Sequence, residues 1–179
     1  QDDGGRFSAV AASTTLSVVN LLDSVVVETD REDTDGTPFN GTKANVVYDS
    51  SLGGLKLTDP TANATGTYDF VDTLDLGNTF SLTLKRHFQG VGFYTGDQFD
   101  NRTDNIDTWT DFDGSIANDA NAKIAVRTTT DDPSGSPTYT SFNDFANGTF
   151  RARGFQFRIT LETNDTAQNM NLQQAGYTA

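Results

Sequence analysis

Short stretches in which apolar and polar residues alternate are the feature that most limits what this chain of 179 residues folds into. In FSLTLKRHF (residues 80–88) the apolar side chains fall mainly on one side of an extended strand, and they do so again in GFQFRITLE (residues 154–162). No segment keeps apolar residues at helical spacing over three turns. The pattern therefore predicts an all-β chain.

Further strands are predicted at AKIAVRT (residues 122–128) and, earlier in the chain, at KANVVYD, GGLKLT and GTYDF. LSVVNLL and SVVVET, between residues 16 and 29, indicate two strands or one long bent strand. Residues 1–5 and 30–41 are polar enough to be loops. With roughly eight to ten strands in all, the expected fold is a jelly-roll-like antiparallel β-sandwich with long polar loops.

One irregularity is expected within the last predicted strand. Phe150 and Ala152 lie on the opposite phase from Phe155, so a bulge or kink at Gly154 is needed to bring all three onto one face.

The polar stretch TDPTANATG divides the chain into a shorter and a longer part. We expect residues 1–66 to form an N-terminal β segment that packs on or extends the sandwich, and residues 67–179 to form the sandwich itself. Because the chain begins at Gln1 rather than at an initiator Met, we expect it to be a fragment or a processed product.

Charge and composition exclude several classes of function. Twelve basic and 25 acidic residues give a formal net charge of −13, which disfavours nucleic acid and anionic membrane surfaces as partners. The absence of cysteine rules out disulfides, thiolate zinc sites and a cysteine nucleophile. No apolar run is long enough to insert into a membrane. His87, the single histidine, lies on the polar face of its predicted strand, so a surface or interface position is expected.

Two acidic stretches, DREDTDG and TWTDFDG, resemble part of a calcium loop. Alignment on their glycines places Arg31 or Trp109 at the first ligand position of an EF-hand, and Thr42 or Ala120 where a bidentate Glu is required. Neither stretch is an EF-hand. We expect acidic turns between strands and no cofactor, with a looser Ca²⁺ site left open.

Catalysis is not expected from this sequence. Glycoside hydrolysis needs two carboxylates at a set separation in space, which a sequence does not reveal. Glu is scarce and no carboxylate lies in an apolar stretch, so no pair stands out and the chain is expected not to be an enzyme.

The candidate ligand-binding residues are Trp109, Asp111, Asp113 and Tyr139. Trp109, the only tryptophan, is suited to stacking on a sugar face, and a place in the core or at the edge of the sandwich is the alternative.

Three ordered blocks of the sequence carry a family resemblance: TYDFVDTLDLGNTFSLTLKRHF, DTWTDFDG, and AKIAVRTTTDDPSGSPTYTSFNDFANGTFRARGFQFRITLETND. Together they resemble a module of bacteriophage tail-tip and host-specificity proteins, the central-fibre or J-like proteins of siphoviruses and their relatives in gene transfer agents. The resemblance runs from Tyr68 to Thr178. Its motifs appear here as Asp75–Gly77, Trp109–Asp113, Arg127–Thr138 and Phe145–Arg158.

The chain departs from the module at two kinds of position. TTTDD stands where TTDDD is usual, and Tyr139 and Phe142 stand where tryptophans are expected, which weakens any fixed aromatic platform. Residues 1–67 match nothing in the module.

The resemblance implies a structural virion protein of a phage tail tip or tail fibre, extracellular in location, that attaches the particle to the host cell. Its expected partners are other tail proteins, further copies of itself in a homotrimer, and a glycan or protein of the host surface. Two alternatives stay open: a carbohydrate-binding module of a glycan-active enzyme, and a purely architectural decoration or adaptor domain.

Overall fold

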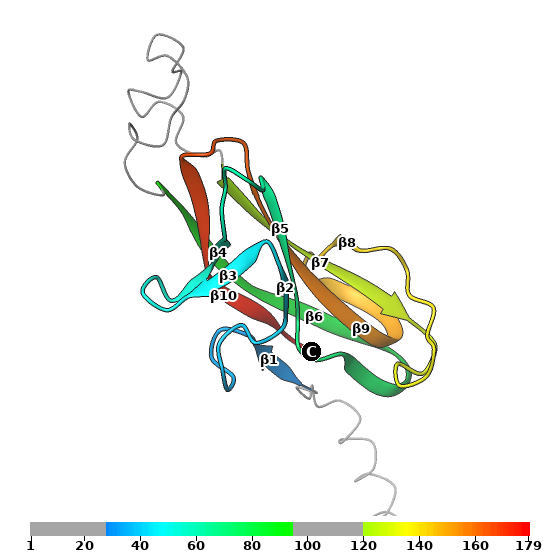
Figure 1. Ribbon diagram of the computed structural model, residues 1–179. Helices are drawn as coiled ribbons and strands as arrows, with labels where there is room; N and C mark the ends of the chain where they lie inside the picture. The colour runs from blue at the N-terminus through cyan, green and yellow to red at the C-terminus, as the bar shows by residue number, and fades with distance from the viewer. Residues whose placement is uncertain (1–27, 95–119) are drawn as a thin grey trace, which may run out of the picture.

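The computed structural model describes residues 28–94 and 120–179, which form ten β-strands and no helix (Figure 1). The predicted all-β class is confirmed, and the antiparallel strands nearly close into a barrel-like shape. Within the described residues no helix is long and apolar enough to cross a membrane. The strands are β1 (Thr29–Arg31), β2 (Thr42–Ala44), β3 (Val46–Asp49), β4 (Gly54–Leu57), β5 (Thr65–Asp69), β6 (Leu74–Tyr94), β7 (Ala120–Thr129), β8 (Asn143–Asp144), β9 (Gly148–Thr163) and β10 (Gln168–Thr178).

The long strand β6 belongs to both sides of the fold. Its first half, from Leu74 to Leu84, pairs with β9, and its second half, from Lys85 to Tyr94, pairs with β10. β9 is also bonded to β5 and β7, whereas β10 is also bonded to β4 and β1. Every pairing is antiparallel. Because β9 and β10 each pair with several strands and both pair with β6, they are the central strands of two layers that share β6.

Most predicted strands are confirmed. Residues 80–88 lie in β6, 122–128 in β7 and 154–162 in β9, while KANVVYD divides into β2 and β3. Most of the stretch between residues 16 and 29 lies outside the described residues. Strand β10 has no counterpart among the predicted strands.

The buried face of β9 changes at Gly154 as expected, because Gly154 and Phe155 are buried in succession. The additional residues of the nearby register shift lie in β6, where the stretch from Asp75 to Phe80 is opposite Gly154 to Ala152. A Cβ atom added at Gly154 would lie 2.5 Å from Cγ of Pro133. Glycine therefore lets the loop that follows β7 approach the backbone of β9 closely.

Phe157 lies at the centre of an aromatic core that joins the two layers. Its ring stacks on Tyr177 of β10 at a centroid distance of 4.4 Å, and it contacts Phe70 at 5.5 Å and Phe145 at 5.3 Å. All four side chains are buried. Such packing of large apolar surfaces is the main favourable contribution to folding.

The prediction for the apolar face of residues 80–88 is wrong at one end. Leu84 is buried and Phe88 partly buried, but Phe80 is 54% exposed. β10 pairs with β6 only from Lys85 onward, so the second layer does not extend over this end of the strand.

The segment of residues 28–41, here called the N-terminal strap, is more ordered than the loop expected for residues 30–41. Its strand β1 pairs with β10, and the backbones of Glu28 and Ala179 exchange two hydrogen bonds. Phe39 is fully buried and contacts Tyr68 at a ring distance of 5.7 Å. Phe39 thus anchors an otherwise polar segment. Through this contact and the pairing of β1 with β10, the strap closes one edge of the core.

Candidate functional site

Two pockets lie on either side of the loop that connects β5 to β6. The first, here called the acidic pocket, has a volume of about 230 Å³. The second, the arginine pocket, has a volume of about 150 Å³. Val71, which is 53% exposed, lines both of them. The acidic pocket is lined by Asp30, Glu32, Asp35, Gly36, Thr37, Asn40, Val71 and Asp72, and the arginine pocket by Asp69, Phe70, Val71, Thr73, Arg127, Phe142, Gln156 and Phe157.

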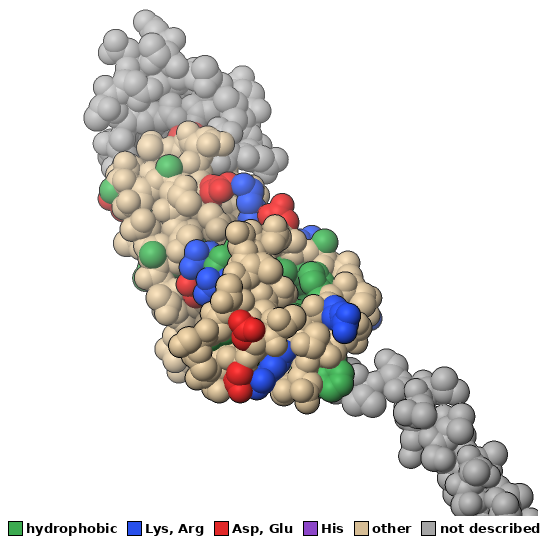
Figure 2. All heavy atoms as spheres, turned by 90° about the vertical axis from the view of Figure 1, so that its right-hand side faces the viewer, with side chains coloured by type: hydrophobic (Ala, Val, Ile, Leu, Met, Phe, Trp, Pro, Cys, Tyr) green, Lys and Arg blue, Asp and Glu red, His purple; other side chains and the backbone are tan. Residues whose placement is uncertain are grey.

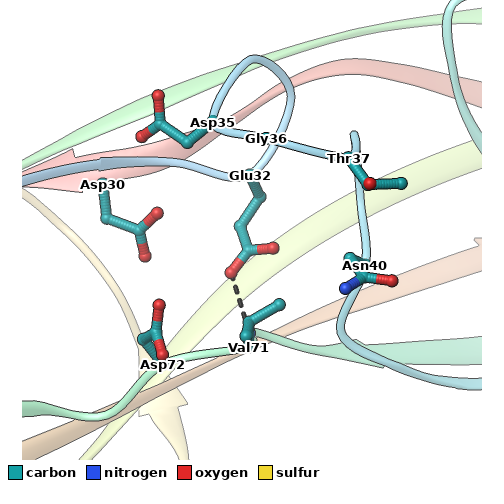
Figure 3. A pocket seen from close by; sticks show the side chains of 8 residues that line it. All are labelled: Asp30, Glu32, Asp35, Gly36, Thr37, Asn40, Val71 and Asp72. Atoms are coloured by element: carbon teal, nitrogen blue, oxygen red, sulfur yellow. Dashed lines mark hydrogen bonds between the residues drawn. The ribbon is translucent and has the colours of Figure 1, made fainter.

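The strap brings most of the carboxylates to the acidic pocket. Asp30 lies in β1 and Glu32 begins the turn that follows it, and both line the pocket beside the β5–β6 loop. Figure 3 shows the carboxyl groups of Asp30 and Asp72 facing each other, whereas that of Asp35 points away. Arg31, on the opposite side of the strap, pairs with Asp33 at 2.8 Å and does not line the pocket.

Glu32 ties the strap to the sheet. Its carboxylate accepts a hydrogen bond from the Tyr68 hydroxyl and another from the Val71 backbone N–H at 2.8 Å (Figure 3). Burial raises the pKa of Glu32, although both hydrogen bonds favour its charged form. Glu32 is therefore a structural carboxylate held in place rather than a free ligand group.

Asp30 has the most perturbed carboxyl group in the acidic pocket. Burial, followed by repulsion from Glu32 and Asp72, raises its pKa to about 7. Its Oδ2 atom is buried without a hydrogen-bond partner among the described residues. A carboxyl group whose pKa lies near the working pH is suited to proton transfer.

The acidic pocket contains two facing carboxyl groups, those of Asp30 and Asp72, but no metal-binding cluster among the described residues. In the parts of the chain that are described, no three Asp, Glu, His or Cys side chains are arranged to hold a metal ion. Hydrolysis of a glycoside needs a second carboxylate at a set separation, and Asp72 is the group that faces Asp30 (Figure 3).

The arginine pocket is built on the outer face of β7 and β9. The Arg127 guanidinium lies 4.8 Å from the ring centre of Tyr139 and 4.7 Å from that of Phe142. The Arg158 guanidinium lies 4.5 Å from the same Phe142 ring and binds both oxygens of Asp69, at 2.5 and 2.8 Å. These contacts hold two planar cations in fixed orientations.

A hydrogen-bonded chain of neutral groups continues from Arg127. Its Nε and Nη2 atoms donate to Oε1 of Gln156 at 2.9 and 2.6 Å, and Nε2 of Gln156 donates to the Thr73 hydroxyl at 2.9 Å. The pocket is therefore lined by oriented donors and acceptors beside apolar rings, which is the usual composition of a small polar-ligand site.

Next to this pocket, the loop between β7 and β8 is fixed to the sheet by ion pairs. Arg153 bridges Asp75 at 3.0 Å and Asp132 at 2.8 Å. Thr140 bonds to Thr128 through both its backbone and its side chain. Figure 2 views the side of the molecule on which β7 and β8 lie in Figure 1, where acidic and basic side chains are interspersed rather than gathered by sign.

Only one of the predicted site residues can be placed. Tyr139 lies against Arg127 and is partly buried beside the arginine pocket, although it is not among the residues that line it. Trp109, Asp111 and Asp113 fall outside the described residues. The structure therefore gives no grouping of the four.

Sequence reasoning missed the residues that form both pockets. Asp30 and Glu32 were assigned to an acidic turn, although their spacing of two residues is a signal for a shared face. Arg127, Gln156 and Thr73 come from three segments that only the fold brings together.

Comparisons of the chain with protein-family models, with curated proteins and with solved structures find no match.

Proposed function

We propose that this chain is a non-enzymatic structural module of a bacteriophage tail tip or tail fibre, and that it attaches the particle to a glycan or protein of the host surface. The proposal combines the resemblance over residues 68–178 with the all-β framework. Attachment requires a stable scaffold that presents polar groups in fixed positions, and loops on rigid sheets are the usual place for such groups.

One observation carries the proposal: the blocks that carry the resemblance also build the arginine pocket and its support. Arg127 begins the Arg127–Thr138 block, and Tyr139 directly follows it. Arg153 belongs to the Phe145–Arg158 block. Two of these side chains are oriented by ring contacts at the pocket, and Arg153 is fixed by two ion pairs. The motifs thus act together at one surface rather than as unrelated turns.

The test is binding of the full chain to bacterial envelopes. The fluorescently labelled protein is incubated with envelope preparations from a panel of candidate hosts and with their purified surface polysaccharides, and the supernatant is assayed for reducing sugar. We expect saturable binding to some envelopes and no release of reducing sugar.

A matched pair of variants locates the binding surface. Val71→Glu places a charge between the two pockets, whereas Val91→Glu places one at the other end of β6, at a side chain of similar exposure (48%). Val71→Glu should abolish most envelope binding and Val91→Glu should leave it unchanged. Release of reducing sugar that Asp72→Asn abolishes would instead establish a hydrolase.

A purely architectural role is the second candidate, because the ion pairs of Arg153 serve the fold itself. It predicts no envelope binding by any form of the chain. Particles that lack this module would then still adsorb to cells.

A further inference from the structure

Arg127 differs from Arg153 and Arg158, two arginines of the neighbouring strand β9 that both pair with carboxylates. Arg158 binds Asp69 through two nitrogens, and Arg153 bridges two carboxylates. Arg127 instead donates to the neutral amide oxygen of Gln156. Among the described residues no carboxylate pairs with Arg127, and its Nη1 atom donates to none of them.

The position of this guanidinium favours recognition of an anion by geometry as well as by charge. Contacts with the rings of Tyr139 and Phe142 fix the plane of the fork, so little side-chain freedom remains to be lost on binding. Arg127 lines a pocket of about 150 Å³. Arg158 binds Asp69 through Nε and Nη2, whereas Gln156 occupies these two atoms in Arg127. The edge of Arg127 formed by Nη1 and Nη2 is therefore the one that would meet the two oxygens of a carboxylate.

We propose that the arginine pocket binds the carboxylate of a terminal acidic sugar, with Arg127 as the residue that holds it. This inference rests on the attachment function proposed above. The Thr73 hydroxyl and the Gln156 amide are the groups that contact the hydroxyls of the same sugar ring. The volume of about 150 Å³ admits the carboxylate end of one terminal residue and excludes a chain.

The residues around the arginine pocket also limit the negative charge of the ligands that it can bind. The acidic pocket begins on the other side of Val71, with Asp72 and Asp35 in its lining. Asp69 lines the arginine pocket itself, so a second carboxylate on the ligand would be repelled by this cluster of negative charge. The chain's net charge of −13 acts weakly over distances beyond about 8 Å at physiological ionic strength, so the local arrangement decides. The site therefore selects a singly charged sugar over a polyanion.

The experiment is an NMR titration of the isotope-labelled full chain with three matched probes: sialyllactose, its methyl ester and lactose. The ester removes the charge and adds one methyl group, and lactose lacks the acidic sugar. Amide signals of Thr73, Arg127 and Gln156 should shift with sialyllactose. The ester and lactose should bind at least about tenfold more weakly, as expected when a charged pair is lost. Polygalacturonate, a polyanion, should bind less tightly per carboxylate.

Variants separate a positioning effect from recognition. Arg127→Gln should remove the preference for the acid over the ester, and Arg127→Lys should restore part of it because the charge returns without the fork. The matched control is Lys123→Gln, on the same strand, whose ammonium pairs with Glu162 at 2.7 Å. Thermal melting of each variant confirms that the fold is retained.

Each outcome decides between the two proposals. Equal affinity for the acid and its ester, no binding of sialyllactose, or an unchanged preference in Arg127→Gln overturns the carboxylate assignment. If the unmodified chain still binds envelopes in that case, the attachment function stands. If it binds neither envelopes nor any probe, both proposals fail.

Discussion

Two buried tyrosines show how the environment of one hydroxyl group determines its contribution to stability. The Tyr68 hydroxyl donates to the buried carboxylate of Glu32 and accepts from the Gly41 N–H at 2.8 Å. The Tyr177 hydroxyl donates at 3.3 Å to Glu28, which is exposed. Both rings are fully buried, so a change to Phe alters the hydroxyl alone.

Tyr68→Phe is expected to lower the free energy of unfolding by about 2–3 kcal/mol, because it leaves a buried carboxylate and a backbone N–H without a partner. Tyr177→Phe should cost less than about 1 kcal/mol, because water replaces its partner at Glu28. Chemical denaturation of both variants measures the difference. Equal losses would show that the Tyr68 hydroxyl, which donates to Glu32, stabilises the fold no more than the Tyr177 hydroxyl, which donates to Glu28.

At the scale of elements, Gly154 links strand β9 to the loop that follows β7. Gly154→Ala places a methyl group 2.5 Å from Pro133 and 2.9 Å from Thr129, and the proline ring is too stiff to move aside freely. We expect a loss of about 1–3 kcal/mol in the free energy of unfolding. Gly148→Ala on the same strand is the matched control, since its new methyl group meets nothing nearer than 3.9 Å. Similar melting temperatures for the two variants would contradict the close approach.

Strand β10 marks the limit of what alternation predicts. Its burial does not alternate, because Gln168, Asn169 and Asn171 are buried along with its apolar residues. Asn169 forms two hydrogen bonds of 2.9 Å with the backbone of Leu57, so its polar side chain is satisfied inside the fold. The alternation pattern therefore finds β9, whose buried residues are apolar except for Thr163, and misses the central strand of the other layer.

The candidate site was less predictable than the strands for a related reason. Tyr139 is predicted from the sequence only as an aromatic companion of Trp109, and its role in ligand binding stays a prediction. Arg127 is oriented by a ring and an amide that are 12 and 29 residues away in the sequence. The pKa of Asp30 is raised first by burial, which the fold creates, and then by repulsion from Glu32 and Asp72. Pairings of this kind depend on the topology, which composition and spacing do not specify.

For the molecule as a whole, the carboxyl groups predict an acidic optimum of stability. The folded state raises the pKa of Asp30 to about 7, mainly through burial, and raises that of Glu32 for the same reason. Their contribution is complete below the ordinary carboxyl pKa and is lost as the pH rises toward 7. Asp75, hydrogen-bonded to Arg153, has a lowered pKa, and its contribution is lost as the pH falls below about 4.

The melting temperature should therefore be highest at about pH 4–5 and fall toward pH 8. Asp30→Asn should flatten this decline, by about 1 kcal/mol once solvent screening of a half-exposed group is allowed for. Asp144→Asn changes the net charge equally at an exposed position outside the acidic pocket, so it should leave the slope nearly unchanged. If both variants flatten the fall of the melting temperature equally, the fall results from general repulsion among the acidic residues rather than from Asp30.

The sharing of β6 between the two layers has a mechanical consequence. A pull on one layer reaches the other through the covalent backbone of 21 consecutive residues as well as through the packed interior. Stress applied across the module is thereby borne in tension along a single polypeptide, and the halves cannot slide apart until that polypeptide itself is drawn out of both ladders.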